Sequence, residues 1–549
     1  QDQQKGQQIV GSLGDGRDPF RWVFLSDVCK HCEEAGCLEA CPTGSIVRTE
    51  VGSVLVQDDV CNGCGYCVVS CPFGVIDRRP EPLPDAGGAF KCTFCYDRQK
   101  SGLVPACAKV CPTESIVFGR LDDLRARASQ RVQQLKQNGY DDAQLYDPLE
   151  TSVRGIHAFF LLLGGPEAYG LPPKPQVPTI YLKSAWSSAI ATAVAAFIAV
   201  LCAFVWPRSA PSATKMCMTD EQRLDQLREQ AWDKGVVDGR GVDVAGGPIP
   251  RKAGYYGKPV VKPPVWTWEI PVYFFVGGLS GMSAVIAVIG LIFQQGDVAR
   301  TAMWLAAIGA ILSPILLIMD LGRPSLFLNM LRVFKYQSPM SVGAWILFVF
   351  GGCAAPGLVA LELHAHQTFA GGFDQFLQVI AFLLILGSAF WGMFLATYTG
   401  VLLGATAIPA WFLHRALLPI HFGVASLGSA VALLELLGHR IVPLAALGFL
   451  TAGIQTLLWI WLEIDKHGAA DRALHEKGSG WLIRAGEILL GPLALILGVA
   501  NLVPLAAISF LLGALISRFG WAWAGKVCAR EAPSATTLPR SRARYANKR

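Results

Sequence analysis

Residues 61–76 read CNGCGYCVVSCPFGVI, and this stretch decides the fold of the N-terminal part of the chain. Its cysteines follow the spacing C-x2-C-x2-C-x3-C-P, in which three thiolates bind one iron–sulfur cluster and the fourth binds the other cluster of a pair. The ending C-P-x-x-x-I also closes two neighbouring cysteine groups, so half of a ferredoxin is repeated along the chain. The repeat predicts an α+β ferredoxin-like domain that holds 4Fe–4S clusters.

The rule for the fourth cysteine also predicts how the thiols are shared between clusters. The first thiol set comprises Cys29, Cys32, Cys37 and Cys71. The second thiol set comprises Cys41, Cys61, Cys64 and Cys67. The third cysteine group comprises Cys92, Cys95, Cys107 and Cys111. This group lacks a complete partner set, so we expect two clusters complete within the chain, and up to four if a further motif lies upstream.

Dense cysteines also occur in disulfide frameworks, and thiolates also bind zinc. Of the 16 cysteines, 12 fall between Cys29 and Cys111, in quartets with a proline after each fourth cysteine. This spacing, together with the repeat, favours iron–sulfur clusters over both alternatives.

The sequence around the cysteines resembles the iron–sulfur (beta) subunit of membrane-bound formate dehydrogenases. The matching strings are DVCKHCEEAGCLEACPTGSI (27–46), CNGCGYCVVSCPFGVI (61–76) and KCTFCYDRQKSGLVPACAKVCPTESIVFG (91–119). The likeness continues through RVQQLKQNGYDDAQLYDP (131–148), YGLPPKPQVPT (169–179) and the apolar LKSAWSSAIATAVAAFIAVL (182–201), so it covers about residues 20–207. The resemblance implies four 4Fe–4S clusters, of which the first would come from an N-terminal motif absent here, and one anchoring helix.

The rest of the chain has the composition of a membrane protein. The chain is 52% hydrophobic and 16% charged, whereas ordinary soluble domains are about 25% charged. Apolar stretches of about 20 residues are long enough to span a bilayer. We expect one anchoring helix and then an all-α polytopic membrane domain of eight helices. The candidates are 184–206, 268–293, 299–319, 339–363, 375–404, 417–437, 441–463, 482–499 and 502–520.

The eight-helix part resembles the polysulfide-reductase membrane subunits called NrfD-like, over about residues 260–520. The matching strings are WEIPVYFFVGGLSG (268–281), DLGRPSLFLNMLRVFKYQSPMSVGAW (320–345) and TYTG (397–400). The resemblance implies electron exchange with a membrane quinone, without haem. It also implies that Tyr273 and Tyr398 contact the quinone head group, although tyrosines near helix ends also form interfacial belts. Glu269 could face the same pocket or the membrane interface.

Ionisable residues in apolar spans are functional candidates. Asp320 and Arg323, in DLGRP, are expected to pair as a salt bridge that closes the bundle or serves a proton route. Glu435 could relay protons. Among the histidines only His421 lies well inside a span, so the sequence offers no facing pair of haem ligands, and we expect no haem.

Lysines and arginines cluster in 207–267, 320–338, 464–481 and the tail, whereas 294–298 and 364–374 have none. The positive-inside rule then predicts a cytoplasmic linker and C-terminus. The single anchor predicts the iron–sulfur domain on the periplasmic or exoplasmic face of the cell (inner) membrane. This topology puts Tyr273 and Tyr398 on the far side from the clusters, which conflicts with electron transfer between them.

The predicted domains are an iron–sulfur domain (1–180), an anchor (181–207), a linker (208–266), the NrfD-like domain (267–521) and a basic tail (522–549). Met218, within the linker, would open a plausible N-terminus of a second, fused polypeptide. The leading interpretation is a non-catalytic electron-transfer subunit of a respiratory formate dehydrogenase, which relays electrons between a separate molybdenum or tungsten pterin subunit and quinone. The alternatives are the same module in a polysulfide or thiosulfate reductase or a hydrogenase, and, more distantly, a redox-coupled ion pump or transporter. No basic patch interleaved with aromatics is found, so no nucleic-acid partner is expected.

Overall fold

The computed structural model describes residues 4–9, 21–79, 86–205, 261–366, 372–464, 472–476 and 478–530. Most of the predicted linker and the tail from residue 531 onward lie outside the described residues, as does the helical stretch expected after Met218. The predicted domain boundaries therefore stay predictions at these places.

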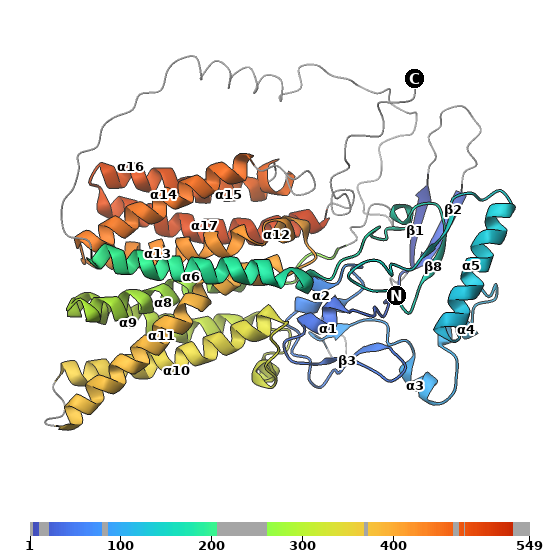
Figure 1. The fold of residues 1–549 in the computed structure, drawn as a ribbon, viewed down its shortest axis with the longest axis horizontal. Helices are drawn as coiled ribbons and strands as arrows, with labels where there is room; N and C mark the ends of the chain where they lie inside the picture. Colours follow the sequence, from blue (N-terminus) through green and yellow to red (C-terminus); the bar gives the residue numbers. More distant parts are fainter. Residues whose placement is uncertain are drawn as a thin grey trace, which may run out of the picture. The chain divides into compact units, whose positions relative to one another are not determined.

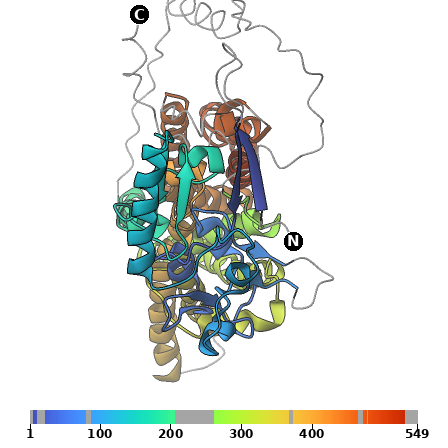
Figure 2. The ribbon, with the colours of Figure 1, turned by 90° about the vertical axis from the view of Figure 1, so that its right-hand side faces the viewer.

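The N-terminal region is built from short hairpins and short helices, as an α+β ferredoxin-like domain requires. Each strand pairs with the next in an antiparallel two-stranded sheet. The strands are β1 Gln4–Ile9, β2 Arg21–Ser26, β3 Ile46–Arg48, β4 Val54–Val56, β5 Asp77–Arg78, β6 Ala89–Phe90, β7 Ala143–Tyr146 and β8 Phe160–Leu163. The helices are α1 Gly36–Ala40, α2 Tyr66–Ser70, α3 Tyr96–Lys100, α4 Ala106–Lys109, α5 Leu121–Gln137, η1 Pro166–Tyr169 and η2 Pro178–Tyr181. Figure 2 shows α5 beside the β7–β8 hairpin, against which it packs.

The membrane region is entirely helical in the described residues (Figure 1). Its longer helices are α6 Leu182–Val205, α8 Glu269–Ile292, α9 Gly296–Met319, α10 Pro339–Ala365, α11 Gly372–Gly404, α13 Leu417–Leu436, α14 Val442–Ile464, α15 Gly478–Ile488 and α17 Val503–Arg530. The shorter ones are η3 Pro324–Leu331, α12 Pro409–Leu413, η4 Arg472–Glu476, η5 Leu489–Leu493 and α16 Ala494–Val499. Nine helices among the described residues are long and apolar enough to cross a membrane, which confirms the nine predicted spans.

Most helix ends lie within three residues of the prediction, and two differ by more. The span predicted as 482–499 begins at Gly478 and is formed by α15, η5 and α16 together, with a π-helical turn at Leu489–Leu493. The last helix continues to Arg530, nine residues past the predicted end of the domain at 521. Its last turns remain buried at Cys528 and Ala529, so packing rather than hydropathy sets where it ends.

The helix ends establish which side of the bundle carries the iron–sulfur domain. Trp266, which leads into α8, donates to the carbonyl of Cys64, and Ala407, just after α11, donates to the carbonyl of Val69. The start of α8 and the end of α11 therefore both lie beside the iron–sulfur domain. Tyr273 and Tyr398 lie within two turns of those ends, on the same side as the clusters, so their predicted position on the far side was wrong.

The predicted side of the C-terminal tail lies outside the described residues and stays a prediction, whereas the end of α17 can be placed. The Trp411 indole, on the short helix after α11, donates to the carbonyl of Trp521 in the C-terminal part of α17. The end of α17 and the iron–sulfur domain thus share one side of the bundle. Two cations of the charge count, Arg323 and Lys335, donate to carbonyls of the iron–sulfur domain, so they are docking residues as well as loop charges.

Candidate functional site

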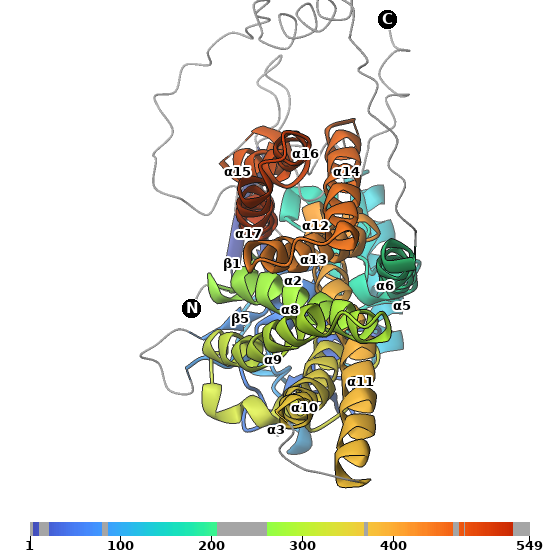
Figure 3. The same ribbon diagram turned by 90° about the vertical axis from the view of Figure 1, so that its left-hand side faces the viewer.

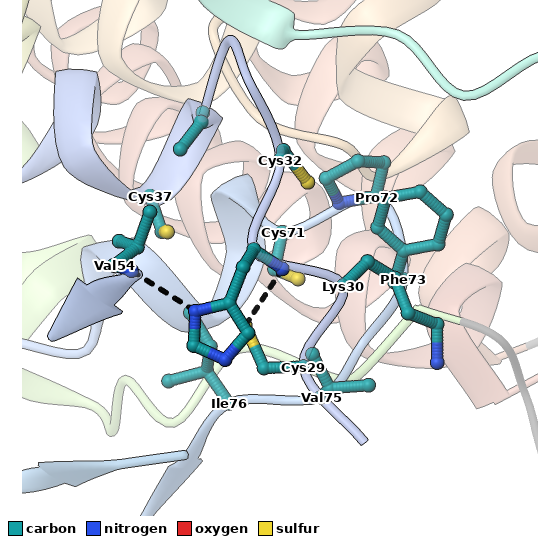
Figure 4. A pocket seen from close by; sticks show the side chains of 13 residues that line it. Cys29, Lys30, Cys32, Cys37, Val54, Cys71, Pro72, Phe73, Val75 and Ile76 are labelled. Atoms are coloured by element: carbon teal, nitrogen blue, oxygen red, sulfur yellow. Dashed lines mark hydrogen bonds between the residues drawn. The ribbon is translucent and has the colours of Figure 1, made fainter. Parts of the chain in front are cut away.

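The first thiol set lines one pocket in the iron–sulfur domain. Figure 4 shows Cys29, Cys32, Cys37 and Cys71 around this pocket, with Pro72 and Phe73 beside them. Three of the thiols come from the first motif and the fourth comes from the end of the second. This is the combination that the spacing rule predicts.

The second thiol set also converges. Burial raises the pKa of Cys67, and the thiols of Cys64, Cys41 and Cys61 raise it further because like charges nearby disfavour the thiolate. Cys37 of the first set acts on Cys67 as well, so the two sets are neighbours. Three thiols of the second set come from its own motif and Cys41 comes from the first, again as predicted.

One local turn recurs in all three motifs. The residue just before the second cysteine adopts a positive φ: His31 at 47°, Gly63 at 71° and Phe94 at 58°. A left-handed residue at this position closes the tight C-x2-C loop, and glycine adopts this conformation without strain. The rings of His31 and Phe94 pack at a tilt, with centroids 4.5 Å apart, so the two strained turns lie against each other.

The residues of the two complete sets suit 4Fe–4S clusters. The twelve motif cysteines are free thiols in the structure. Within the described ranges no three Cys, His, Asp or Glu side chains lie close enough to hold one metal ion. A zinc site would need four ligands in a tight tetrahedron, with Zn–S at about 2.3 Å. Each thiol around a cubane binds a different iron, so a wider set is what a cluster needs.

Polar atoms around the first pocket support the same conclusion. Lys91 Nζ lies 3.3 Å from Cys29 Sγ and places a positive charge beside a prospective thiolate. His31 is buried, and its Nδ1 accepts from the Val54 N–H at 2.9 Å, so its Nε2 carries the hydrogen. That Nε2 has no hydrogen-bond partner among the described residues, although it lines the pocket. A buried donor without a partner fits the sulfur of a bound cluster.

The third cysteine group is different. Cys107 is exposed, and the two short helices that adjoin these cysteines, α3 and α4, have no buried residues. Cys111 Sγ lies within hydrogen-bond distance of the hydroxyls of Ser115 and Thr113, at 3.2 and 3.5 Å, and these contacts lower its pKa to about 6. Cys41 has the same pair of hydroxyls two and four residues on, so the repeat holds in structure even where the thiol set is incomplete.

The second thiol set lies directly against the membrane domain. Tyr66, between Cys64 and Cys67, donates its hydroxyl to the carbonyls of Leu402 at 3.0 Å and Ala405 at 3.3 Å, at the end of α11. Its ring stacks on that of Trp266, whose indole donates to Cys64 O at 3.2 Å. Leu402 is one helical turn from Tyr398. The sequence did not reveal this contact, because a tyrosine inside a cysteine motif carries no sign of its partner.

Arg323 and Asp320 do not form the salt bridge that was predicted for them. Arg323 instead pairs with Asp58 of the iron–sulfur domain at 2.9 Å and donates to the carbonyl of Asp58 at 2.6 Å. Asp320 accepts from the backbone N–H and the hydroxyl of Thr267, at 2.9 and 3.0 Å. Thr267 also donates to Glu269, so the predicted pocket residue Glu269 lies beside Asp320 at the helix ends. Arg323 therefore fastens the two domains together.

Tyr273 and Tyr398 meet inside the bundle, on α8 and α11. Both side chains are buried, and their hydroxyls are hydrogen-bonded to each other. The ring of Tyr398 packs on Gly343, where an added Cβ would come within 2.0 Å of the ring. The glycine is therefore required by the tyrosine, a dependence that the string SVGAW did not reveal. The structure brings the two predicted tyrosines together, with Glu269 about one turn away on α8.

Comparison with known proteins assigns the two parts. Residues 20–121 match the family described as 4Fe-4S dicluster domain, and residues 259–443 match Polysulphide reductase, NrfD. The chain joins a 4Fe–4S domain to an NrfD-type membrane domain. This confirms the predicted fusion and the predicted fold class.

Individual relatives match the iron–sulfur part. The chain is 44% identical over 164 residues to the formate dehydrogenase iron-sulfur subunit of Haemophilus influenzae, covering 29% of this chain and 51% of that protein. It is 40% identical over 188 residues to the formate dehydrogenase-O iron-sulfur subunit of Escherichia coli, covering 33% and 61%. It is 48% identical over 105 residues to the thiosulfate reductase electron transfer subunit PhsB of Salmonella typhi, covering 19% and 52%. The chain thus spans between half and two thirds of the length of these relatives.

Proposed function

We propose that this chain is the electron-transfer and membrane-anchor subunit of a formate dehydrogenase-type complex, which relays electrons between 4Fe–4S clusters and a membrane quinone. A separate molybdenum or tungsten pterin subunit would carry out the chemistry on the substrate. The chain would be integral to the cell membrane, with the iron–sulfur domain and the end of α17 on one face.

The observation that carries this proposal is the contact between the second thiol set and the helix ends that bear the tyrosine pair. Tyr66 and Trp266 fill the space between them, and both side chains are buried. Electron tunnelling weakens steeply with distance, so a quinone site has to lie close to the last carrier. The second thiol set would therefore hold the cluster next to the quinone, and the first would hold the one before it.

When bound, the clusters supply one-electron carriers whose potentials depend on hydrogen bonds to sulfur and on burial. The protein's own residues set these conditions. Lys91 holds a positive charge at Cys29. Lys335 of the membrane domain interacts electrostatically with Cys37 of the first set and Cys41 of the second. Docking of the membrane domain thus changes the charge around the second thiol set.

The tyrosine pair can donate one hydrogen bond to a quinone carbonyl. Each hydroxyl can donate a single hydrogen bond. Tyr273 and Tyr398 bond only to each other among the described residues, so one hydroxyl hydrogen is left without an acceptor. A quinone carbonyl oxygen would accept a hydrogen bond from this hydroxyl. The Tyr398 ring packs against Gly343, which would form one wall of the site.

The extent of similarity favours formate over sulfur compounds as the source of electrons. The matches to formate dehydrogenase iron–sulfur subunits extend over 164 to 192 residues, whereas those to the thiosulfate and dimethyl sulfoxide reductase subunits cover 105 and 104 residues. The longer match therefore includes sequence outside the cysteine motifs that all these subunits share. A thiosulfate or polysulfide partner, or a hydrogenase, is the second candidate.

The test is anaerobic purification of the intact complex, identification of the co-purifying subunits, and an assay of formate-dependent reduction of a quinone analogue. We expect a pterin subunit and formate-driven quinone reduction. A pterin subunit without formate activity would support the electron relay and overturn the assignment of formate as the substrate. Absence of any quinone reduction with chemically reduced clusters would overturn the relay itself.

The tyrosine site has its own matched test. Tyr398→Phe removes the hydroxyl and leaves the ring, so we expect kcat/KM for the quinone analogue to fall about 10- to 100-fold, the effect of one lost hydrogen bond at a reacting group. Tyr336→Phe changes an exposed tyrosine near the same membrane face and should leave the rate unchanged. Equal rates in the two variants would exclude Tyr398 from the quinone site.

A further inference from the structure

A second group of buried polar side chains lies in the half of the membrane domain formed by α13, α14, α15 and α17. His421 Nδ1 lies 2.8 Å from Gln455 Oε1, and His421 Nε2 lies 2.9 Å from Ser517 Oγ. Ser517 donates to Glu487 Oε1 at 2.8 Å, and that oxygen is 3.3 Å from His421 Nε2. Together with Arg518, these residues form what we call the buried carboxylate cluster.

The cluster contains polar atoms that no side chain or backbone group satisfies. Arg518 is almost fully buried, and its Nη2 donates to the carbonyl of Phe422 at 2.9 Å. Among the described residues, Arg518 Nε and Nη1 and Glu487 Oε2 have no hydrogen-bond partner. Burying ionisable groups in a membrane is costly, and unsatisfied buried atoms of this kind indicate bound water. The sequence contained a hint of this cluster, since Glu487 and Arg518 are ionisable residues within apolar spans.

A cavity opens at the other end of the same helices. It has a volume of about 140 Å³ and lies among α13, α14, α16 and α17, at the end of the bundle opposite the iron–sulfur domain. One water needs about 10–15 Å³ of such volume, so the cavity has room for several. Its polar lining is Glu435, which is half-buried, and Asn501.

The helical spans that line the cavity also carry the buried carboxylate cluster, and Figure 3 shows these helices, α13 to α17, together in one part of the bundle. Each helix that supplies a polar residue to the cluster also lines the cavity one or two turns away, and seven residues is close to two full turns. The pairs are His421 with Gly428, Glu487 with Ala494, Ser517 with Phe510, and Gln455 with Ala452. The helix of Glu487 passes through the π-helical turn η5 between cluster and cavity, a feature frequent at functional sites.

We propose that Glu435, the cavity and the buried carboxylate cluster form a proton-uptake route that opens on the membrane face opposite the iron–sulfur domain. A proton passes from solution to the Glu435 carboxylate, through water in the cavity, and onto the Glu487 carboxylate, which becomes a carboxylic acid. The titratable and charged groups that face Glu487 are His421 from α13 and Arg518 from α17, while α14 supplies only the uncharged Gln455. Arg440 is the charged group that acts on Glu435.

The route leads toward the tyrosine pair. The Phe422 ring, next to His421, lies 6.0 Å from that of Phe274, which adjoins Tyr273. Reduction of a quinone to quinol consumes two electrons and two protons, and the route would supply protons for it from the far face. This last step rests on the proposed function, whereas the proton-binding site does not.

The test is pH-difference infrared spectroscopy of the intact complex, with the rate of hydrogen–deuterium exchange at the buried carboxyl as the readout. We expect a carboxyl band that disappears in Glu487→Gln. Glu435→Gln should keep this band and slow its exchange ~10-fold or more, since a positioned acid–base group accelerates proton transfer by at least that factor. Glu362→Gln, which alters a carboxylate paired with Arg300 at the same end of the bundle, should change neither.

A second variant guards against misfolding of Glu487→Gln. Ala432→Leu fills the cavity and leaves every titratable group in place, so it too should slow the exchange. If the exchange rate is unchanged in both Glu435→Gln and Ala432→Leu, the proton route is overturned. The cavity would then be a site for a lipid chain. Because the measurement needs no turnover, such a result would leave the proposed electron relay untouched.

Discussion

The first two thiol sets and the third cysteine group share one motif and differ in what surrounds them. The first two sets are formed almost wholly by buried cysteines, and the second is covered by the membrane domain. The third group adjoins two short helices that have no buried residue, and the nearby Leu103, Val104 and Val110 are exposed. The contrast shows that the motif fixes the turn and the hydroxyl contacts, while neighbouring elements complete and cover the site.

The largest expected effect is the difference in iron content between a cysteine variant in a complete thiol set and one in the incomplete third group. Two complete sets correspond to about eight irons per chain, four in each cluster. We expect Cys64→Ser to lose about four irons and to abolish quinone reduction by reduced protein, because a ligand beside the membrane domain is gone. Cys107→Ser, its counterpart in the exposed group, should keep the iron content of the parent chain. Loss of four irons in Cys107→Ser would show that the third group is complete after all.

The sequence predicted what depends on local spacing. The cysteine intervals were enough to assign Cys71 to the first set and Cys41 to the second, since a ligand rule with fixed spacing needs no tertiary knowledge. The membrane spans followed from hydropathy in the same way. The two tyrosines were placed by resemblance, and the structure brings them together.

What depends on tertiary contact could not be predicted. Asp320 and Arg323 lie three residues apart and carry opposite charges, so a local pair was the natural expectation. Their partners, Thr267 and Asp58, are distant in sequence. Thr267 meets Asp320 within the membrane domain, and Asp58 meets Arg323 where the two domains contact each other. The same limit applies to Arg323 in the charge count, because it was counted as a membrane-topology signal and it binds the iron–sulfur domain.

A smaller effect should come from the close approach of the two domains at Gly63. Its φ is +71°, and an added Cβ would lie 2.0 Å from Gly87 O and 3.0 Å from Gly322 Cα in the membrane domain. We expect Gly63→Ala to displace the docked loop and slow reoxidation of reduced clusters by a quinone analogue ~10-fold or more, since about 1.4 kcal/mol corresponds to a tenfold change in rate. Stopped-flow absorbance would measure it.

The control for this variant lies in the exposed group. Gly102 has nearly the same φ, +70°, and nothing lies within 4 Å of an added Cβ. Gly102→Ala carries the backbone strain of about 1–2 kcal/mol without the collision. If both variants slowed reoxidation equally, strain rather than docking would explain the result.

The Arg323 contact with Asp58 should matter less than the glycine approach. Arg323→Gln removes the ion pair and the bonds to carbonyls of the iron–sulfur domain, which we expect to weaken docking by about 2–3 kcal/mol, the range for hydrogen bonds to a charged group. Asp58→Asn keeps the carbonyl acceptors and loses only a half-exposed ion pair, worth about 0–1 kcal/mol. The midpoint of thermal release of the iron–sulfur domain would rank the two. A larger loss in Asp58→Asn would contradict the role given to the carbonyls.

The smallest expected effect compares one tyrosine from each region. Tyr66→Phe removes a buried hydroxyl that donates to Leu402 O at 3.0 Å, so docking should weaken by about 1 kcal/mol, as for a typical hydrogen bond. Tyr96→Phe removes a hydroxyl that bonds Glu50 at 2.9 Å in the exposed group, where water replaces the lost partner, and should change stability by less than about 0.5 kcal/mol. The same thermal measurement distinguishes them. Equal effects would mean that Tyr66 serves the domain contact by ring stacking on Trp266 alone, and the double variant Tyr66→Phe with Trp266→Phe would then show the larger loss.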